Sequence, residues 1–414
     1  MRIAVVGSGI SGLTAARLLA RAHEVVLLEA QDRPGGHTHT HGVEVDGRTV
    51  SVDTGFIVYN DRNYPNFTRL LDELGIPGRP TSMSFSVHDE ASGLEYNGGT
   101  LAGLLSRRRN ALSPRFWSLV RDVLRFNREA PGVLALTGTG PALGDWLEAE
   151  RYGPPFVERY LVPMAAAIWS VPTARMADFP AKRLVEFFRN HGLLSLTDRP
   201  QWYVVEGGSR SYVDRILPEL GDAVRLGTPV RAVRRPAGGG ALVATDAGTE
   251  RFDAVVLACH SDEALALLTD PSPQEREVLG AIGYQRNDVV LHTDPRVLPP
   301  RRRSWAAWNY RLPRAGADGA TVSYWMNRLQ HIDVATPLLV TLNQDARIDP
   351  DRVLARMEYA HPVFDAPAVE AQARRGELSG VRDTWYCGAY WRYGFHEDGC
   401  LSAVEVAAGL GVSW

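Results

Sequence analysis

The chain has 414 residues, a mass of 45.5 kDa, 45% hydrophobic and 22% charged residues, and a formal net charge of −3. This size favours two domains, and the composition is that of an ordinary globular protein. The small negative charge argues against a nucleic-acid partner, because nucleic acids are bound by strongly basic surfaces. Three cysteines without C-x-x-C spacing predict a reduced, cytoplasmic protein, and no apolar run is long enough to span a bilayer.

The N-terminal segment, up to Glu29, predicts a strand, a glycine-rich turn, a helix and a second strand. Gly7, Gly9 and Gly12 follow the apolar run at residues 2–6 in the pattern G-x-G-x-x-G, and Glu29 ends the second strand. The glycines allow a tight turn, close approach of a pyrophosphate, and close packing of helix on strand. We expect a dinucleotide site in which the pyrophosphate lies at the helix N-terminus and Glu29 binds the adenosine ribose. The acid disfavours NADP, whereas NAD and FAD are both compatible with this unit.

The middle of the chain changes character. From residue 81 to 200 the pattern is mostly helical, rich in Arg, Trp and Phe, and indicates an inserted domain. Strands are expected at residues 224–233, 242–245, 252–258 and 384–389 and in several runs within 287–343, and a final helix at 401–410. A second strand–turn–helix unit with G-x-G-x-x-G is absent from the sequence, so we expect no separate NAD(P)H domain.

Two further segments decide between the dinucleotides. The run AQDRPGGHTHT after Glu29 carries Arg33, Gly35 and Gly36 in an R-x-G-G pattern, and VDTGF follows with Asp53 and Gly55. With TWYCGAYWRYGFHEDGCLSAVEVAAGL near the C-terminus, these motifs resemble the superfamily of FAD-dependent amine oxidases, phytoene desaturases and protoporphyrinogen oxidases. The resemblance covers residues 1–60 and 384–411, with a looser match at 228–267, and implies one noncovalently bound FAD.

The resemblance implies an α/β fold with a Rossmann-like FAD-binding domain of the glutathione-reductase type, amine-oxidase-like, and an inserted mixed α+β substrate domain. The FAD domain is expected over residues 1–75, 200–280 and 375–414, and the substrate domain over 76–199 and 281–374. A helix starting near Cys400 is expected to aim its positive end at the flavin. The implied cofactor-binding residues are Gly7, Gly9, Ser11, Gly12, Glu29, Ala30, Arg33, Gly35, Gly36, His37, Asp53, Gly55, Val230 (through its backbone), Gly388, Asp398, Gly399 and Ser402.

A narrower resemblance concerns the substrate. The sequences GGH at 35–37, EGGSRSYV at 206–213 and GFHEDG at 394–399 are similar to a bacterial subgroup of predicted NAD/FAD-binding proteins, often associated with cyclopropane-fatty-acid-synthase-like methylases. This implies an FAD-dependent oxidoreductase that dehydrogenates or desaturates a small-molecule or lipid-like apolar substrate, with a methylase as a candidate partner. The alternatives are an amine oxidase, a redox-neutral double-bond isomerase, and a noncatalytic flavin-bearing subunit of a lipid methylase. The sequence leaves the electron acceptor and the oligomeric state open.

His396, Glu397 and Tyr390 in the closing motif are the catalytic candidates. An imidazole or a carboxylate there could orient substrate or move a proton, or the pair could only stabilise a turn. Tyr390 and Trp391 could wall the substrate cavity or belong to the core. Cys400 stands at the wrong place for the cysteine–flavin link known in amine oxidases, which favours noncovalent FAD.

Three histidines, His37, His39 and His41, alternate along the chain and would share one face of a strand. No carboxylate or thiol that could complete a metal site lies nearby in the sequence, so no metal is expected. His37 stands where relatives commonly carry arginine, and either hydrogen bonding around the cofactor or plain packing is expected of it.

Two features argue against an ordinary amine oxidase. Lys182 is the only lysine in the chain, and residues 286–292, where many amine oxidases carry a lysine near the flavin, contain none. Gly399 is expected to replace the aromatic residue that many amine oxidases place just before their final helix. The inserted domain offers apolar residues for a lipid tail, namely Phe116, Trp117, Phe156, Trp169, Phe187 and Phe188.

The arginine runs at residues 107–109 and 301–303 have aromatic and apolar neighbours. A basic amphipathic surface of this kind could hold a phosphate head group or bring the protein to the membrane as a peripheral protein. The alternative is that both runs are solvated loops.

Overall fold

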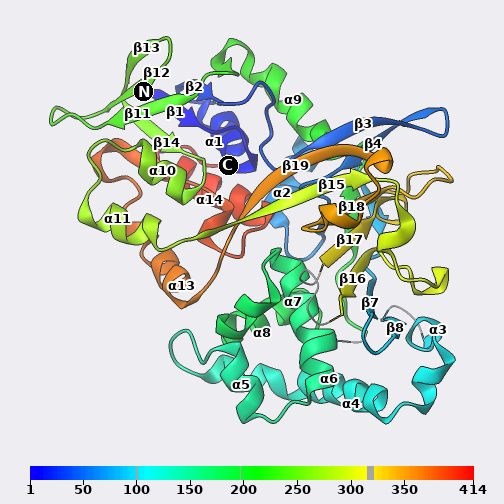
Figure 1. Ribbon diagram of the computed structural model, residues 1–414. Helices are drawn as coiled ribbons and strands as arrows, with labels where there is room; N and C mark the ends of the chain where they lie inside the picture. The colour runs from blue at the N-terminus through cyan, green and yellow to red at the C-terminus, as the bar shows by residue number, and fades with distance from the viewer. Residues whose placement is uncertain (99–100, 196, 315–320) are drawn as a thin grey trace.

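The computed structural model describes residues 1–98, 101–195, 197–314 and 321–414 (Figure 1). A five-stranded parallel sheet in the order β10-β2-β1-β14-β20 forms the centre of one half of the molecule. Its strands are β1 (Arg2–Val6), β2 (Glu24–Leu28), β10 (Val224–Arg225), β14 (Ala254–Leu257) and β20 (Thr384–Tyr386). They come from the three segments expected to form the FAD domain. The Rossmann-like α/β fold is confirmed, whereas the exact domain boundaries stay a prediction.

Alternate residues of the parallel strands pack on two different layers, which explains their almost continuously apolar sequence. On one face, Ile3 and Val5 contact helices α1 (Ile10–Leu19), α2 (Pro65–Glu73), α9 (Arg210–Leu220) and α14 (His396–Gly409). On the other face, Ala4 and Val6 contact a layer built from the antiparallel sheet β11-β12-β13 and three helices. Its elements are β11 (Val230–Arg234), β12 (Ala241–Thr245), β13 (Gly248–Phe252), α10 (Ser261–Leu267), α11 (Pro273–Gly280) and α13 (Ala366–Ala373).

A seven-stranded mixed sheet in the order β19-β15-β18-β17-β16-β7-β8 forms the second half. Its strands are β7 (Phe85–Asp89), β8 (Leu94–Asn97), β15 (Tyr284–His292), β16 (Trp308–Leu312), β17 (Thr321–Trp325), β18 (Leu339–Leu342) and β19 (Val353–Pro362). β7 joins through parallel pairing with β16, which lies far away along the chain. The mostly helical reading of residues 81–200 is therefore wrong for β7 and β8, since a short strand completed by so distant a partner gives little local signal.

Smaller elements connect the two halves. The hairpin β3 (Thr40–Val45) with β4 (Arg48–Asp53) packs in the core of the second half, and the sheet β5-β9-β6 contributes to the cores of both halves; β5 is Val58–Asn60, β6 Gly78–Thr81 and β9 Trp202–Val205. The helices at the bottom of Figure 1 are α3 (Leu101–Leu104), α4 (Pro114–Glu129), α5 (Leu143–Ala149), α6 (Pro154–Phe156), α7 (Val162–Trp169) and α8 (Ala181–Asn190), and α12 (Met326–Leu329) follows β17. No helix in the described part of the chain is long and apolar enough to cross a membrane.

The final helix, α14, begins at His396, earlier than the sequence predicted. The carboxylate of Asp398 accepts a hydrogen bond of 2.9 Å from the backbone N–H of Phe395, which caps the new first turn. Gly399 lies inside this helix. A glycine is required there because a Cβ would stand 2.7 Å from the Cγ2 of Ile10 in α1. The residue just before the helix is the aromatic Phe395, so the expectation that Gly399 replaces an aromatic wall is wrong.

Candidate active site

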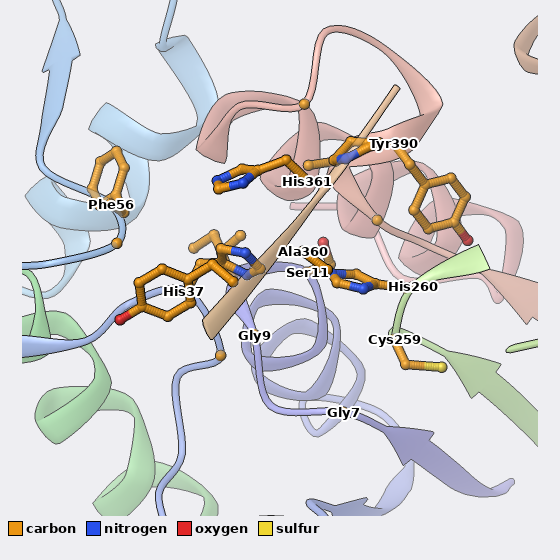
Figure 2. A pocket seen from close by; sticks show the side chains of 18 of the residues that line it. Gly7, Gly9, Ser11, His37, Phe56, Cys259, His260, Ala360, His361 and Tyr390 are labelled. Atoms are coloured by element: carbon orange, nitrogen blue, oxygen red, sulfur yellow. The ribbon is translucent and has the colours of Figure 1, made fainter. Parts of the chain in front are cut away.

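A cavity of about 1090 Å³ lies between the parallel sheet, the seven-stranded sheet and α7. Figure 2 shows the part of its wall around the turn that follows β1. Sites for a single small ligand typically have volumes of roughly 300–1,000 Å³, so this cavity has room for a cofactor together with a substrate. Of the residues predicted from the sequence, those that line it are Gly7, Gly9, Ser11, Glu29, Ala30, Arg33, Gly36, His37, Gly55, Val230, Gly388, Tyr390 and His396.

In the turn between β1 and α1, each of the three glycines is needed for a different reason. Gly7 has a φ of +100°, which disfavours any side chain. A Cβ on Gly12 would stand 1.8 Å from the carbonyl oxygen of Gly7, so Gly12 permits the contact of helix and strand without lining the cavity. A Cβ on Gly9 would meet no atom within 4 Å and would occupy open space at a cavity-lining position. This open cradle at the N-terminus of α1 fits a pyrophosphate.

Glu29, at the end of β2, is held by the backbone around it. Its Oε2 accepts hydrogen bonds from the backbone N–H and the hydroxyl of Ser8, at 2.9 and 2.5 Å, and its Oε1 accepts one of 2.9 Å from the backbone N–H of Gln31. A carboxylate keeps further acceptor capacity beside these bonds. Glu29 therefore lines the cavity in a fixed position with Ala30 and Val230 beside it, as a ribose-binding acid would require.

The loop that carries Arg33 lies against the glycine turn. Arg33 donates hydrogen bonds to the carbonyl oxygens of Gly36 (2.9 Å) and Thr38 (3.0 Å), and burial lowers the pKa of its guanidinium. Gly35 has a φ of +109°, its N–H donates to the carbonyl of Ser8, and it shapes the loop without lining the cavity. Arg33 therefore holds the loop closed as well as lining the cavity.

His37 is part of a group of aromatic rings in the cavity wall (Figure 2). Its ring centroid lies 5.4 Å from that of His361, 5.7 Å from His260 and 5.2 Å from Tyr359. Burial lowers the pKa of His37 well below its ordinary value, so the ring is neutral. Its Nε2 is buried and has no hydrogen-bond partner among the described residues. A buried polar atom without a partner is costly, and a bound FAD could supply the partner.

The alternating histidines do not form a metal site among the described residues, in which no group of three or more histidine, cysteine or carboxylate side chains could hold a metal ion. Instead, the Nδ1 of His39 lies 2.9 Å from the hydroxyl of Tyr359, and the ring centroids of His39 and His41 lie 4.0 Å apart with their planes tilted by 35°. Burial lowers the pKa of His39 to about 4.

Asp53 is a structural residue in this arrangement. Its carboxylate accepts hydrogen bonds from the hydroxyls of Thr40 and Ser209, from the backbone N–H of Ser209, and from the amide of Gln330. Burial raises the pKa of Asp53 to about 6. It does not line the cavity, so its predicted direct contact with the cofactor is not supported; it ties β4 to the start of α9 and to the loop after α12.

Three predicted residues of the closing motif lie outside the cavity and stabilise the segment that forms its wall. The hydroxyl of Ser402 accepts a hydrogen bond of 2.9 Å from the N–H of Gly388 and donates one of 2.8 Å to the carbonyl of Gly399. Asp398 accepts from the N–H groups of Tyr393 and Phe395, and burial raises its pKa to about 6. None of Asp398, Gly399 and Ser402 lines the cavity. They position the segment from Gly388 to His396, which does.

The catalytic candidates His396 and Glu397 point to different places. Both oxygens of Glu397 accept hydrogen bonds from the backbone N–H groups of Asn66 and Phe67, at 3.0–3.3 Å, in the first turn of α2. Glu397 does not line the cavity, and these hydrogen bonds support the turn-stabilising alternative, with the first turn of α2 as the element that is capped; a catalytic role for Glu397 stays a prediction.

His396 lines the cavity and stacks on Phe56 with ring centroids 3.5 Å apart and an angle of 13° between the planes. Its Nε2 lies 3.0 Å from the Thr38 hydroxyl and 3.2 Å from the Tyr212 hydroxyl. Burial lowers the pKa of His396 to about 3, so the imidazole is neutral. Tyr390 also lines the cavity; burial raises its pKa, and its hydroxyl has no partner among the described residues. Catalytic roles for these two stay predictions.

An apolar part of the cavity wall was missed in the sequence. The missed residues come from segments far apart in the chain: Phe56 and Ile57 follow the predicted Gly55, and Trp308 and Tyr324 lie on β16 and β17. Only the VDTGF motif gave a signal for any of them. Of the six aromatic residues expected to hold a lipid tail, only Trp169 lines the cavity; Phe116, Phe156, Phe187 and Phe188 are buried in the core.

Comparisons with known proteins show which family and which solved structures the chain is similar to. The family model of flavin-containing amine oxidoreductases matches residues 10–398. The carotenoid phi-ring synthase of Streptomyces griseus is 30% identical over 320 residues, which cover 72% of this chain and 59% of that protein. The chain thus spans about 59% of the length of the curated relatives that it matches over long stretches.

Among solved structures, putrescine oxidase bound to putrescine superposes with a TM-score of 0.70 at 17% identity, covering 99% of both chains. A conjugated-linoleic-acid-producing fatty acid isomerase from P. acnes superposes with a TM-score of 0.69 at 15% identity, also over 99% of both chains. At these identities the likeness shows the fold alone.

Proposed function

Because the chain belongs to the family of flavin-containing amine oxidoreductases, we propose that it dehydrogenates an apolar, acyl-like substrate. FAD is the cofactor, and when bound it supplies the acceptor for a hydride from a substrate carbon. The glycine turn, Glu29 and the loop of Arg33 and His37 would hold it, and the segment from Gly388 to His396 would close the site around it.

The observation that carries the substrate class is that each carboxylate in the described cavity wall already has a partner within the protein. Three carboxylates line it: Glu29 is bonded to Ser8 and Gln31, Glu263 accepts from the N–H of His260, and Glu358 pairs with Arg286 at 3.3 Å. An amine substrate arrives as an ammonium ion, whose burial is costly without a paired charge.

The apolar wall supplies what an acyl chain needs instead. Phe56, Ile57, Trp169, Trp308 and Tyr324 bury hydrocarbon surface and exclude water from the reacting carbon. The neutral His396, which is hydrogen-bonded to Thr38 and Tyr212 and stacked on Phe56, positions this wall. These features support a long apolar substrate over a small amine.

The test is anaerobic mixing of the FAD-loaded protein with unsaturated and methyl-branched acyl lipids, and separately with primary amines and polyamines. We expect the acyl lipids to bleach the flavin absorbance and the amines to leave it unchanged. Fast bleaching by amines, with none by acyl lipids, would overturn the proposal in favour of an amine oxidase.

A variant of the apolar wall sharpens the test. Ile168 lines the cavity from α7, and Ile168→Glu places a charge in the acyl site. We expect it to raise the KM for an acyl substrate at least about 10-fold, which corresponds to ~1.4 kcal/mol. Val381→Glu, at a 50% exposed position outside the cavity, is the matched control and should leave KM unchanged.

A further inference from the structure

The two arginine runs, at residues 107–109 and 301–303, meet at one residue of β8. The carboxylate of Glu95 accepts hydrogen bonds from the guanidinium (2.7 Å) and the backbone N–H (3.0 Å) of Arg301. The carbonyl oxygen of the same residue accepts one of 2.9 Å from the side-chain amide of Asn110, next to the first run. Glu95 therefore fastens together two basic segments that are far apart in the sequence.

Most of the exposed large hydrophobic side chains belong to the segment that contains the first arginine run. Of the nine large hydrophobic residues that are clearly exposed in the described chain, five lie between residues 105 and 136. They are Leu105 (38% exposed), Leu112 (86%), Trp117 (50%), Leu124 (51%) and Leu136 (45%). Single exposed hydrophobic residues need no explanation, but a group in one segment marks a surface that contacts something apolar.

Helix α4 carries the regular part of this surface. Trp117, Arg121, Leu124 and Arg128 are all exposed, and their spacing places them along one face of the helix. The opposite face, with Phe116 at its centre, is buried in the protein core. The outward face of α4 is thus alternately apolar and basic, which is the pattern of a helix that lies in a membrane interface.

Part of the positive charge of this surface is not neutralised by the protein. Arg108, Arg109 and Arg115 are exposed and form no ion pair with any described residue. Arg121 pairs at 3.4 Å with Asp122, which is buried and also accepts a hydrogen bond of 3.1 Å from the N–H of Gly153. Glu129 pairs with Arg128 at the end of the helix. A net positive charge therefore remains around the exposed leucines.

We propose that the α4 surface, defined as the exposed side chains of residues 105–128 with Arg302 and Arg303, docks on an anionic phospholipid bilayer. The arginines bind lipid phosphates, while Leu112, Trp117 and Leu124 enter the apolar boundary of the head-group layer. Arg302, stacked over Trp305 at 4.8 Å, extends the same basic surface on the far side of Glu95. This inference does not depend on the substrate proposed above.

The test is co-sedimentation of the FAD-loaded protein with vesicles of phosphatidylcholine alone and of phosphatidylcholine mixed with phosphatidylglycerol. We expect binding to the anionic vesicles only, and release when the ionic strength is raised, because salt screens exposed charges. The double substitution Arg108→Ser with Arg109→Ser and the single substitution Leu112→Ser should each weaken binding at least about 10-fold, a loss of ~1.4 kcal/mol by the same affinity relation.

The matched controls are Arg234→Ser and Leu354→Ser, which change an exposed arginine and an exposed leucine elsewhere. They should bind vesicles like the unaltered protein, and all variants should unfold at the same temperature because the changed residues are exposed. The proposal is overturned if anionic vesicles do not bind, if neutral vesicles bind equally well, or if the controls weaken binding as much. It is also overturned if the protein forms a dimer that Leu112→Ser dissociates, since the surface would then bind a second copy.

Discussion

Gly36 packs against Gly9: a Cβ added to Gly36 would stand 3.1 Å from the Cα of Gly9. The loop that carries His37 and the turn that begins α1 therefore form one continuous wall of the cavity. The two glycines differ in what they permit. Gly36 has a φ of +57°, whereas Gly9 has an ordinary φ of −65° and open space where a side chain would project.

The first prediction is that Gly9→Ala weakens FAD binding without destabilising the protein. The new methyl group meets no protein atom, but it occupies the cradle in which the pyrophosphate is expected to lie. We expect the Kd for FAD, measured by fluorescence titration, to rise at least about 10-fold, or ~1.4 kcal/mol, with an unchanged thermal midpoint of the FAD-free protein. Gly12→Ala should instead lower that midpoint, because its methyl group would clash with the carbonyl of Gly7. Normal FAD affinity in Gly9→Ala would show that the pyrophosphate lies elsewhere.

The second prediction concerns Glu29. Glu29→Ala should loosen FAD by about 1–3 kcal/mol, the range for hydrogen bonds that lose a charged acceptor. Glu29→Gln is the matched control: it keeps the volume and one acceptor oxygen, so its loss should be smaller. Equilibrium dialysis with FAD measures both. If the alanine variant retained FAD as tightly as the unaltered protein, the ribose would have to be held by another group.

The third prediction separates Glu397 from His396. Glu397→Ala uncaps the first turn of α2 and should lower the free energy of unfolding by about 0.5–2 kcal/mol, while the flavin-reduction rate of folded, FAD-loaded protein stays the same. Glu370→Ala, which changes an exposed glutamate on α13 that has no ion pair with a described residue, is the stability control. Urea unfolding and anaerobic flavin reduction test the two parts. Loss of the reduction rate with unchanged stability would identify Glu397 as a catalytic residue.

The fourth prediction is a loss of stability in acid from buried histidines. Burial lowers the pKa of His292 to about 4 in the folded protein, and an unfolded histidine titrates near 6.5. Between these values the unfolded state binds more protons, so the stability present above pH 6.5 falls as the pH drops towards 4. His292→Gln should flatten this dependence, measured as urea midpoints at pH 7 and pH 5. A midpoint difference as large in the variant as in the unaltered protein would mean that His292 is not buried as a neutral ring.

Two carboxylates act in the opposite direction. Burial raises the pKa of both Asp53 and Asp398 to about 6, above the ordinary value near 3.9. The folded state then binds more protons than the unfolded state between these values, so these two groups favour folding as the pH falls. The loss of stability in acid that is expected from the histidines is therefore partly offset. The comparison of His292→Gln with the unaltered protein isolates the contribution of this one histidine to the pH dependence of stability.

The local patterns of the sequence were sufficient to predict the FAD-binding half of the fold. The strand, glycine turn, helix and acid of the N-terminal segment follow one another directly, so that hydrogen bonding and packing between neighbours fix them. The fold is confirmed by the family match and the solved structures, and the FAD cofactor by the family match. Cavity positions such as Gly9 and Glu29 were identified because their role depends on the local backbone.

Contacts between residues far apart in the chain could not be predicted from the sequence. Glu397 caps a helix whose first residues lie far earlier in the chain, and nothing near Glu397 in the sequence indicates that partner. The apolar wall likewise assembles Phe56, Trp169 and Trp308 from different segments. The two arginine runs were visible individually, but only the shared contacts of Glu95 show that they form one surface.

The most direct test of the central claim is an anaerobic single-turnover reaction with an acyl lipid, in which reduced flavin and product are both quantified. The account predicts one reduced flavin for each product molecule, and a product that has lost two hydrogen atoms from adjacent carbons. Many product molecules of unchanged mass, formed while the flavin stays oxidised at the end of the reaction, would contradict it and identify a redox-neutral isomerase.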